Sequence, residues 1–203
     1  MNARLLIALA LSMLASRTAS AQFQAAPDDA TCVNAARQIV HGRSDPKLAN
    51  ALSEITMCRS VGADALAKTL PTLATESDTA LVARYFGVAN TWADGRLARA
   101  ALDLAANTSA TAPARIYAFG QLIVSLPSDE IFTYAELVRP QLVTHGTVCG
   151  GSLRSHGHIM TDDPLPTNFA QKVMRLAKDV IAEAPDGSEL RNAAECAKYI
   201  ANR

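Results

Sequence analysis

Apolar residues recur at intervals of three and four along most of the chain. Leu48, Leu52 and Ile55 step by four and then by three. Similar steps of three and four continue in Leu66, Leu70 and Leu73, in Leu97, Ala101 and Leu104, in Phe169, Val173, Leu176 and Val180, and in Leu190, Ala194, Ala197 and Ala201. This spacing places apolar side chains on one face of an α-helix. No segment alternates apolar and polar residues long enough to indicate a strand, so we expect an all-α fold.

Helix start signals divide these stripes into segments of ordinary helix length. A short polar side chain before a helix accepts hydrogen bonds from its first N–H groups, and proline is tolerated in the first turn. Such signals occur at Asp45-Pro46, Ser77-Asp78, Asp94, Thr111-Ala112-Pro113 and Ser128-Asp129. Longer, more apolar helices from near 45, 78 and 112 alternate with partners from near 64, 94 and 129. Pro71 and Pro140 should kink or end two of those partners.

The expected helix pairs follow one another with a period of about 30 to 35 residues, as stacked helix-turn-helix repeats do. The segment 94–102, DGRLARAAL, resembles the second helix of a HEAT-type repeat, with an aspartate first and small residues before a leucine. Ala98 stands where the family has arginine, and the basic residue follows at Arg99. The resemblance covers residues 45–143 and implies a short HEAT-like α-α superhelix. An irregular helical bundle is the alternative.

The N-terminus has the pattern of a secretory signal peptide. Arg4 precedes an apolar run that is too short to span a bilayer, and Ala19-Ser20-Ala21 supplies a cleavage site. We therefore expect residues 1–21 to be removed and the protein to be periplasmic or secreted. Residues 22–203 are then expected to form a single helical domain.

From composition and charge we expect the mature protein to be helical and soluble. Alanine is the commonest residue and aromatic residues make up 5% of the chain, which favours helices over sheets. Loss of Arg4 and Arg17 with the signal leaves 17 basic and 19 acidic side chains, a net charge near −2. Without a basic face no nucleic-acid partner is expected, and no later stretch is apolar enough to be a transmembrane segment.

All four cysteines lie in the mature chain: Cys32, Cys58, Cys149 and Cys196. An even number in an exported protein predicts two disulfides, although three pairings are possible. Cys32 begins one helical pattern and Cys58 follows the next, so these two ends meet in an antiparallel pair. The remaining pair would be Cys149–Cys196, which would close the other end of the array.

Residues 144–167 form the longest stretch without a helical pattern, and such loops are usually functional or disordered. The run Cys149-Gly150-Gly151-Ser152-Leu153 is similar to a strand of chymotrypsin-like serine proteases. The Gly-Asp-Ser-Gly-Gly and Ala-Ala-His-Cys motifs of that family are absent, and its double β-barrel does not suit this composition. The protease interpretation is therefore excluded.

A metal site is the stronger interpretation of the same loop. His156 and His158 lie two residues apart, which points both rings to one side of an extended segment, and Asp162 and Asp163 follow. With His145 as a third ligand, the loop has the donors that a catalytic zinc requires. Cys149 is a further possible ligand in the same loop, but a disulfide would remove it.

Two further groups of residues are more ordinary. Trp92, Tyr85 and Phe86 are expected in the core. Four arginines along the proposed stack either line one face or are scattered, solvated ion-pair partners: Arg84, Arg96, Arg99 and Arg115.

These patterns favour a non-catalytic scaffold or binding module for another protein, with a groove between helices or the concave face of the stack as its binding surface. A metal-dependent hydrolase that uses His145, His156 and His158 is the alternative. No cofactor is expected unless that loop binds zinc.

Overall fold

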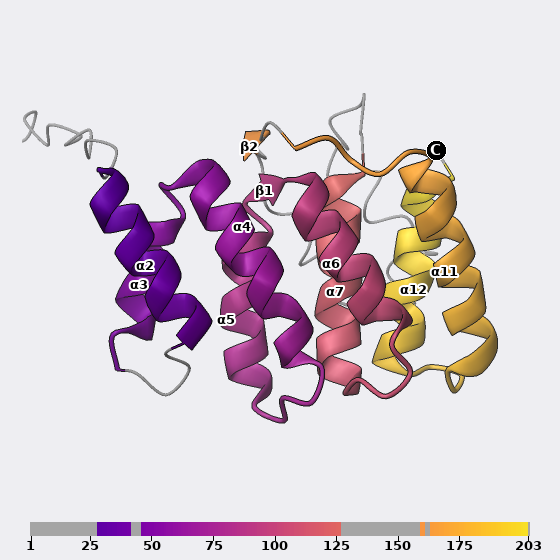
Figure 1. Cartoon of the computed structure of the whole chain (residues 1–203). Helices are drawn as coiled ribbons and strands as arrows, with labels where there is room; N and C mark the ends of the chain where they lie inside the picture. The colour runs from indigo at the N-terminus through magenta and orange to yellow at the C-terminus, as the bar shows by residue number, and fades with distance from the viewer. Residues whose placement is uncertain (1–27, 42–45, 127–158, 161–162, 203) are drawn as a thin grey trace, which may run out of the picture.

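The computed structural model describes residues 28–41, 46–126, 159–160 and 163–202 (Figure 1). These residues are mostly helical, which confirms the expected fold class. The helices and strands, in chain order, are α2 (Asp29–His41), α3 (Leu48–Ile55), α4 (Arg59–Thr69), the 3-10 helix η1 (Leu70–Leu73), α5 (Thr79–Ala89), β1 (Trp92–Ala93), α6 (Gly95–Ala106), α7 (Ala112–Ser125), β2 (Ile159–Met160), α11 (Phe169–Glu183) and α12 (Glu189–Ala201).

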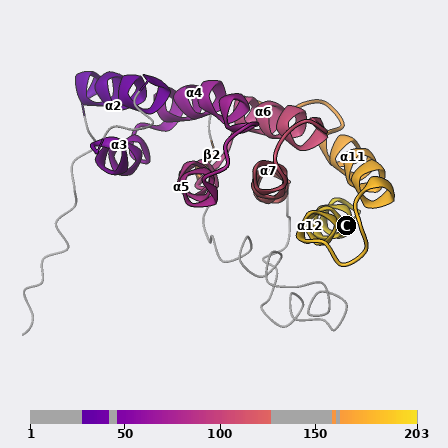
Figure 2. The same cartoon turned by 90° about the horizontal axis from the view of Figure 1, so that it is seen from below.

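The helices lie in two layers (Figure 2). One layer holds α2, α4, α6 and α11, and the other holds α3, α5, α7 and α12. Neighbours within each layer contact one another, and the layers are joined through pairs such as α6 with α7 and α11 with α12. The position beside α6 is occupied by α11, although the two helices are far apart in the chain. The last helix pair therefore packs directly against the α6–α7 pair.

Capping side chains start several helices where the sequence predicts. Asp78 accepts hydrogen bonds from the backbone N–H groups of Ala80 and Leu81 at the start of α5. Ser188 accepts one from Arg191 at the start of α12. Thr111 precedes α7 without a side-chain cap bond, and a proline lies in the first turn of that helix. The starts of α5 after Asp78 and of α7 after Thr111 confirm the sequence prediction.

The predicted start of the partner helix near residue 64 is wrong. That helix, α4, begins at Arg59, five residues earlier. Asp64 lies within the helix, where its carboxylate accepts a hydrogen bond from Lys68 Nζ at 2.6 Å. An acid in a helix can serve such a pair instead of a cap, and sequence spacing alone does not distinguish the two roles. As expected from Pro71, α4 ends at Thr69, and the chain continues into the 3-10 helix η1.

The three aromatic residues expected in the core are fully buried. Tyr85 and Phe86 are residues of α5. The Tyr85 hydroxyl donates a hydrogen bond to the Ile39 carbonyl on α2 at 3.1 Å. The Phe86 ring stacks on Tyr117 of α7, with 6.1 Å between ring centroids. Trp92 forms the start of β1. One continuous apolar core therefore runs from α2 to α12.

The sequence predicted no strand, and the structure contains two very short ones. β1 and β2 pair in parallel, with Trp92 opposite Ile159 and Ala93 opposite Met160. Two residues are too few to leave an alternating pattern in a sequence, so periodicity could not reveal this contact. In the part of the chain that is described, no helix is both long and apolar enough to cross a membrane.

Cys32 and Cys58 form a disulfide, as predicted, with 5.5 Å between their Cα atoms. The bond joins the first turn of α2 to the residue between α3 and α4, and α2 packs against both of these helices. Cys196 is buried on α12. Cys149 lies outside the described residues, so the predicted Cys149–Cys196 pairing stays a prediction.

Replacing Cys32 and Cys58 together with alanine should lower the free energy of unfolding by about 3.5 kcal/mol, because the bond closes a long loop in the unfolded chain. The change is measured as the urea midpoint followed by circular dichroism. Ser53→Ala, at an exposed position on α3, is the control and should change the free energy by less than about 0.5 kcal/mol. An unchanged midpoint in the double variant would show that the bond does not stabilise the fold.

Candidate functional site

The residues proposed as zinc ligands, His145, His156 and His158, lie outside the described residues. Among the residues that are described, no group of three His, Cys, Asp or Glu side chains is placed to hold a metal ion. Asp163 is described, and its carboxylate binds Arg99. The metal site therefore stays a prediction, and the described part of the chain offers two other polar sites.

The first site lies where residues 163–165 cross the N-terminus of α6. The Gly95 backbone N–H donates a hydrogen bond to the Asp163 carbonyl at 3.0 Å. A Cβ atom on residue 95 would lie 1.9 Å from the Pro164 carbonyl oxygen, well inside van der Waals contact. Only glycine allows this approach, so residue 95 fixes the path of the chain toward α11.

Four charged side chains surround this crossing. The fully buried Asp94 caps α6, accepting hydrogen bonds from the Arg96 and Leu97 N–H groups at 2.8 and 3.2 Å. Its other carboxylate oxygen accepts one from Arg96 Nη2 at 2.8 Å. This hydrogen bond, opposed by partial desolvation, raises the pKa of the Arg96 guanidinium above its ordinary value. Arg99 Nη2 binds both carboxylate oxygens of Asp163, at 3.0 and 2.9 Å.

Two arginines and two aspartates thus neutralise one another at this end of α6. Arg96 also reaches Asp163, with 3.4 Å between Nε and Oδ2, and donates to the Ser60 hydroxyl at 3.2 Å. Since each charge already has an opposite charge beside it, the cluster is suited to holding chain segments together. It offers no unpaired charge to a ligand.

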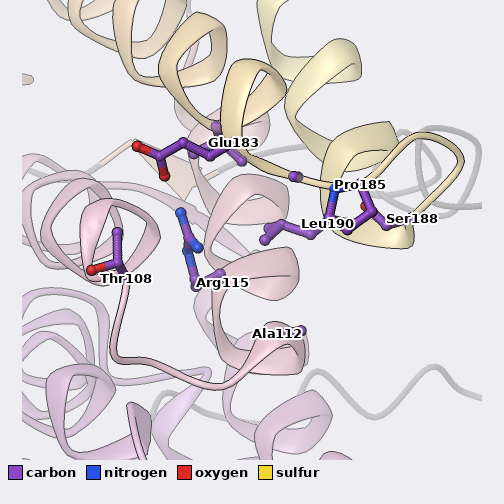
Figure 3. Close-up of a pocket in the computed structure, with 9 residues that line it drawn as sticks. Thr108, Ala112, Arg115, Glu183, Pro185, Ser188 and Leu190 are labelled. Atoms are coloured by element: carbon purple, nitrogen blue, oxygen red, sulfur yellow. The ribbon is translucent and has the colours of Figure 1, made fainter.

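The second site is a pocket at the opposite end of α6, with a volume of about 360 Å³ (Figure 3). The α6–α7 connection and the first turns of α7 form one side, and the end of α11 with the turn into α12 forms the other. Its walls are mainly apolar, with a few polar groups, as in many small-ligand pockets. The residues that line it include Thr108, Ala112, Arg115, Val180, Glu183 and Leu190.

Arg115 is the buried charge of this pocket, with 9% of its surface exposed. Its Nε donates a hydrogen bond to the Ala105 carbonyl at 2.9 Å. Ala105 lies in the last turn of α6, where carbonyls lack partners within the helix. A guanidinium carries five N–H donors, and among the described residues no acceptor takes the others. The outer edge of the guanidinium is therefore free to bind a ligand.

Glu183 lies across the pocket from Arg115, at the end of α11. Figure 3 shows its carboxylate and the guanidinium pointing toward one another. In the described structure no ion pair joins them, and Glu183 is exposed. An acid at a helix C-terminus is not stabilised by the helix dipole, so the dipole does not explain why a glutamate stands at position 183.

The four arginines noted in the sequence do not share one site. Arg96 and Arg99 lie at the crossing of the chain, and Arg84 is exposed on α5. Arg115 lies on α7, beside the far end of α6. Sequence reasoning named Arg115 without distinguishing it from the others. It missed Glu183 as a site residue, because nothing in the sequence placed the end of α11 beside the start of α7.

Comparison with protein-family models, with curated proteins and with solved structures finds no match for this chain. Only its own residues therefore bear on its function.

Gly95→Ala should lower the free energy of unfolding by about 1 to 3 kcal/mol, because the new Cβ must displace backbone at Pro164. Gly87→Ala is the matched control, since a Cβ there meets nothing within 4 Å. It should stabilise helix α5 by about 0.5 to 1 kcal/mol. Urea unfolding of both variants measures the difference. Equal effects of the two substitutions would mean that Pro164 does not pack closely against Gly95.

Asp94→Ala should cost about 2 to 3 kcal/mol, since it removes a helix cap and leaves a partly buried arginine without its main partner. Asp78→Ala removes a cap with the same two backbone bonds, but at an exposed site, and should cost about 1 kcal/mol. Thermal and urea unfolding compare the two. Equal losses would contradict a special role for the Asp94–Arg96 pair.

Proposed function

We propose that the mature protein is an exported, non-catalytic binding module for another protein, and that the pocket beside Arg115 is its binding groove. The observation that carries this proposal is a buried guanidinium with free donors, set in an apolar pocket between two helix pairs. Among the described residues no acid is paired with Arg115, and the edge of a guanidinium is suited to pairing with a planar anion of a ligand.

The architecture supports the same proposal. Two layers of paired helices, with neighbours in contact along each layer, are the arrangement that a HEAT-like stack requires. In the proposed stack, Cys32–Cys58 closes the first helix pairs and Cys149–Cys196 closes the last. The Cys32–Cys58 bond is compatible with an oxidising compartment, which fits the proposed signal peptide and a periplasmic or secreted location.

The pocket favours binding over catalysis. Among the described residues that line it, the charged side chains are Arg115 and Glu183 on opposite sides, and neither is paired there with a nucleophile or a second acid. Serine and cysteine nucleophiles need an adjacent base that is itself held in place. Ser188 lines the pocket and caps α12, accepting a hydrogen bond from Arg191 N–H at 3.3 Å, and the described lining residues include no histidine that could act as its base. The groove is thus equipped to orient a charged group.

Arg115→Met should weaken the interaction with the partner protein by about tenfold or more, the effect of losing a hydrogen bond to a charged group. The tagged mature protein and its variants are isolated from the exported fraction of the cell, and the amount of a defined co-purifying protein is measured. Arg84→Met, which removes an exposed arginine from α5, is the control and should retain the partner.

Recovery of the same partner in equal amount with Arg115→Met would refute the groove as its binding site. Circular dichroism of each variant separates a lost interaction from a lost fold. Arg115→Lys keeps the charge without the two-sided donor geometry, and its binding should fall between the other two variants.

A further inference from the structure

We infer that the Arg115 pocket recognises the free C-terminal carboxylate of a partner polypeptide whose last side chain is small and apolar. This inference rests on the proposed function and names the chemical group that the groove takes. A carboxylate is planar and accepts two parallel hydrogen bonds from the edge of a guanidinium. Arg115 offers such an edge because its Nε is already held by the Ala105 carbonyl at 2.9 Å.

The bond to Ala105 also orients the guanidinium before any ligand arrives. The arginine side chain is nine-tenths buried, so few of its rotamers remain to be lost on binding. A group that is already fixed in its bound position loses less entropy when a ligand binds. With the rest of the side chain buried, the outer edge of the guanidinium is the part that a ligand can reach.

The charge of the pocket favours a monoanion over a phosphate. One arginine supplies the positive charge, and Glu183 faces it across the opening (Figure 3). A phosphate that carries nearly two negative charges would be repelled by Glu183, and among the described lining residues Arg115 is the one cation it would meet. The nearby Arg191, which donates to the Ala184 carbonyl at 3.4 Å, is already paired with Asp186 and Glu195. A carboxylate with a single charge balances Arg115 alone. The pocket is also lined by Ala112, the first residue of α7, where the positive end of the helix dipole favours an anion.

The apolar walls of the pocket indicate which kind of side chain would lie next to the bound carboxylate. Val180, Leu190 and Pro185 contribute apolar surface, and a volume of about 360 Å³ accommodates one small side chain together with its backbone. Burial of apolar surface against these residues would favour an alanine or valine side chain over a charged one.

Glu183 distinguishes a peptide from a simple carboxylic acid. The last residue of a polypeptide carries an amide N–H close to its carboxylate, and a carboxylate such as that of Glu183 accepts a hydrogen bond from such a donor. A free acid such as isovalerate has no donor to offer and would be repelled by Glu183. The pair Arg115 and Glu183 therefore fits the end of a peptide chain.

The test compares four probes on the mature protein. They are a fluorescent tripeptide acetyl-Gly-Ala-Val with a free carboxylate, the same peptide with a C-terminal carboxamide, isovalerate, and inorganic phosphate, the last two measured by competition. We expect the carboxamide to bind at least about tenfold more weakly than the acid, since it loses the charge-assisted bonds. Isovalerate and phosphate should both compete more weakly than the unlabelled acid peptide.

Variants then assign the binding to the pocket. Arg115→Met should reduce binding of the acid peptide to the level of the carboxamide, and Arg84→Met should leave it unchanged. Glu183→Gln should tighten isovalerate by a few fold, because repulsion is removed, and so reduce the preference for peptide over isovalerate. If Arg115→Met does not fold, Glu183→Gln locates the binding instead, because an unchanged preference of that variant for the acid peptide over isovalerate would place the peptide outside the pocket.

Equal binding of the acid and the carboxamide would overturn the inference, as would tighter binding of phosphate or isovalerate than of the acid peptide. Failure of the inference is distinguishable from failure of the proposed function. If the co-purifying protein still depends on Arg115 while the acid and carboxamide peptides bind equally, the groove binds a partner through another group. If the partner does not depend on Arg115, the proposed groove itself is wrong.

Discussion

The close approach of Pro164 to Gly95 is the constraint on which the candidate pocket depends. Because residue 95 has no side chain, the chain can cross the N-terminus of α6 at hydrogen-bond distance. The crossing leads into α11, which packs beside α6, while α12 packs beside α7. The far end of α11 then lies opposite the start of α7, and Arg115 and Glu183 come together around one pocket. A contact at one end of α6 thereby decides what is assembled at the other.

A side chain with the appropriate charge lies at each end of helix α6, Asp94 just before its first residue and Arg115 of α7 beside its last turn. Asp94 accepts hydrogen bonds from the first N–H groups, and Arg115 donates to a carbonyl of the last turn. Both arrangements complement the helix dipole. They differ in what else the charge meets. Asp94 has Arg96 beside it, so its charge is satisfied within the fold, whereas the outer edge of the Arg115 guanidinium faces the pocket. The same physical principle therefore gives a structural clamp at one end and a candidate binding site at the other.

Much of the fold could be predicted from the sequence because local chemistry specifies it. The steps of three and four apolar residues identify α3, α6, α11 and α12, and Asp78 and Asp94 act as caps in the structure because a short acid before an apolar stripe has few other uses. Asp64 shows the limit of this reasoning, since the same residue type within a helix forms an ion pair with Lys68 instead. The disulfide between Cys32 and Cys58 was predictable for a geometric reason, because the ends of two successive antiparallel helices lie close together.

The sequence by itself determined the helical class, most helix starts, the aromatic core and the first disulfide, since each depends on residues close in the chain or on adjacent helices. Only the tertiary structure decided that α11 lies beside α6, that β1 pairs with β2, and that Arg115 is buried while Arg84 is exposed. These features join segments separated by many residues, and a glycine such as Gly95 gives no sign in the sequence of which backbone will pack against it. Candidate site residues such as Glu183 acquire their meaning from that packing, because the pocket exists only where two distant helix pairs meet.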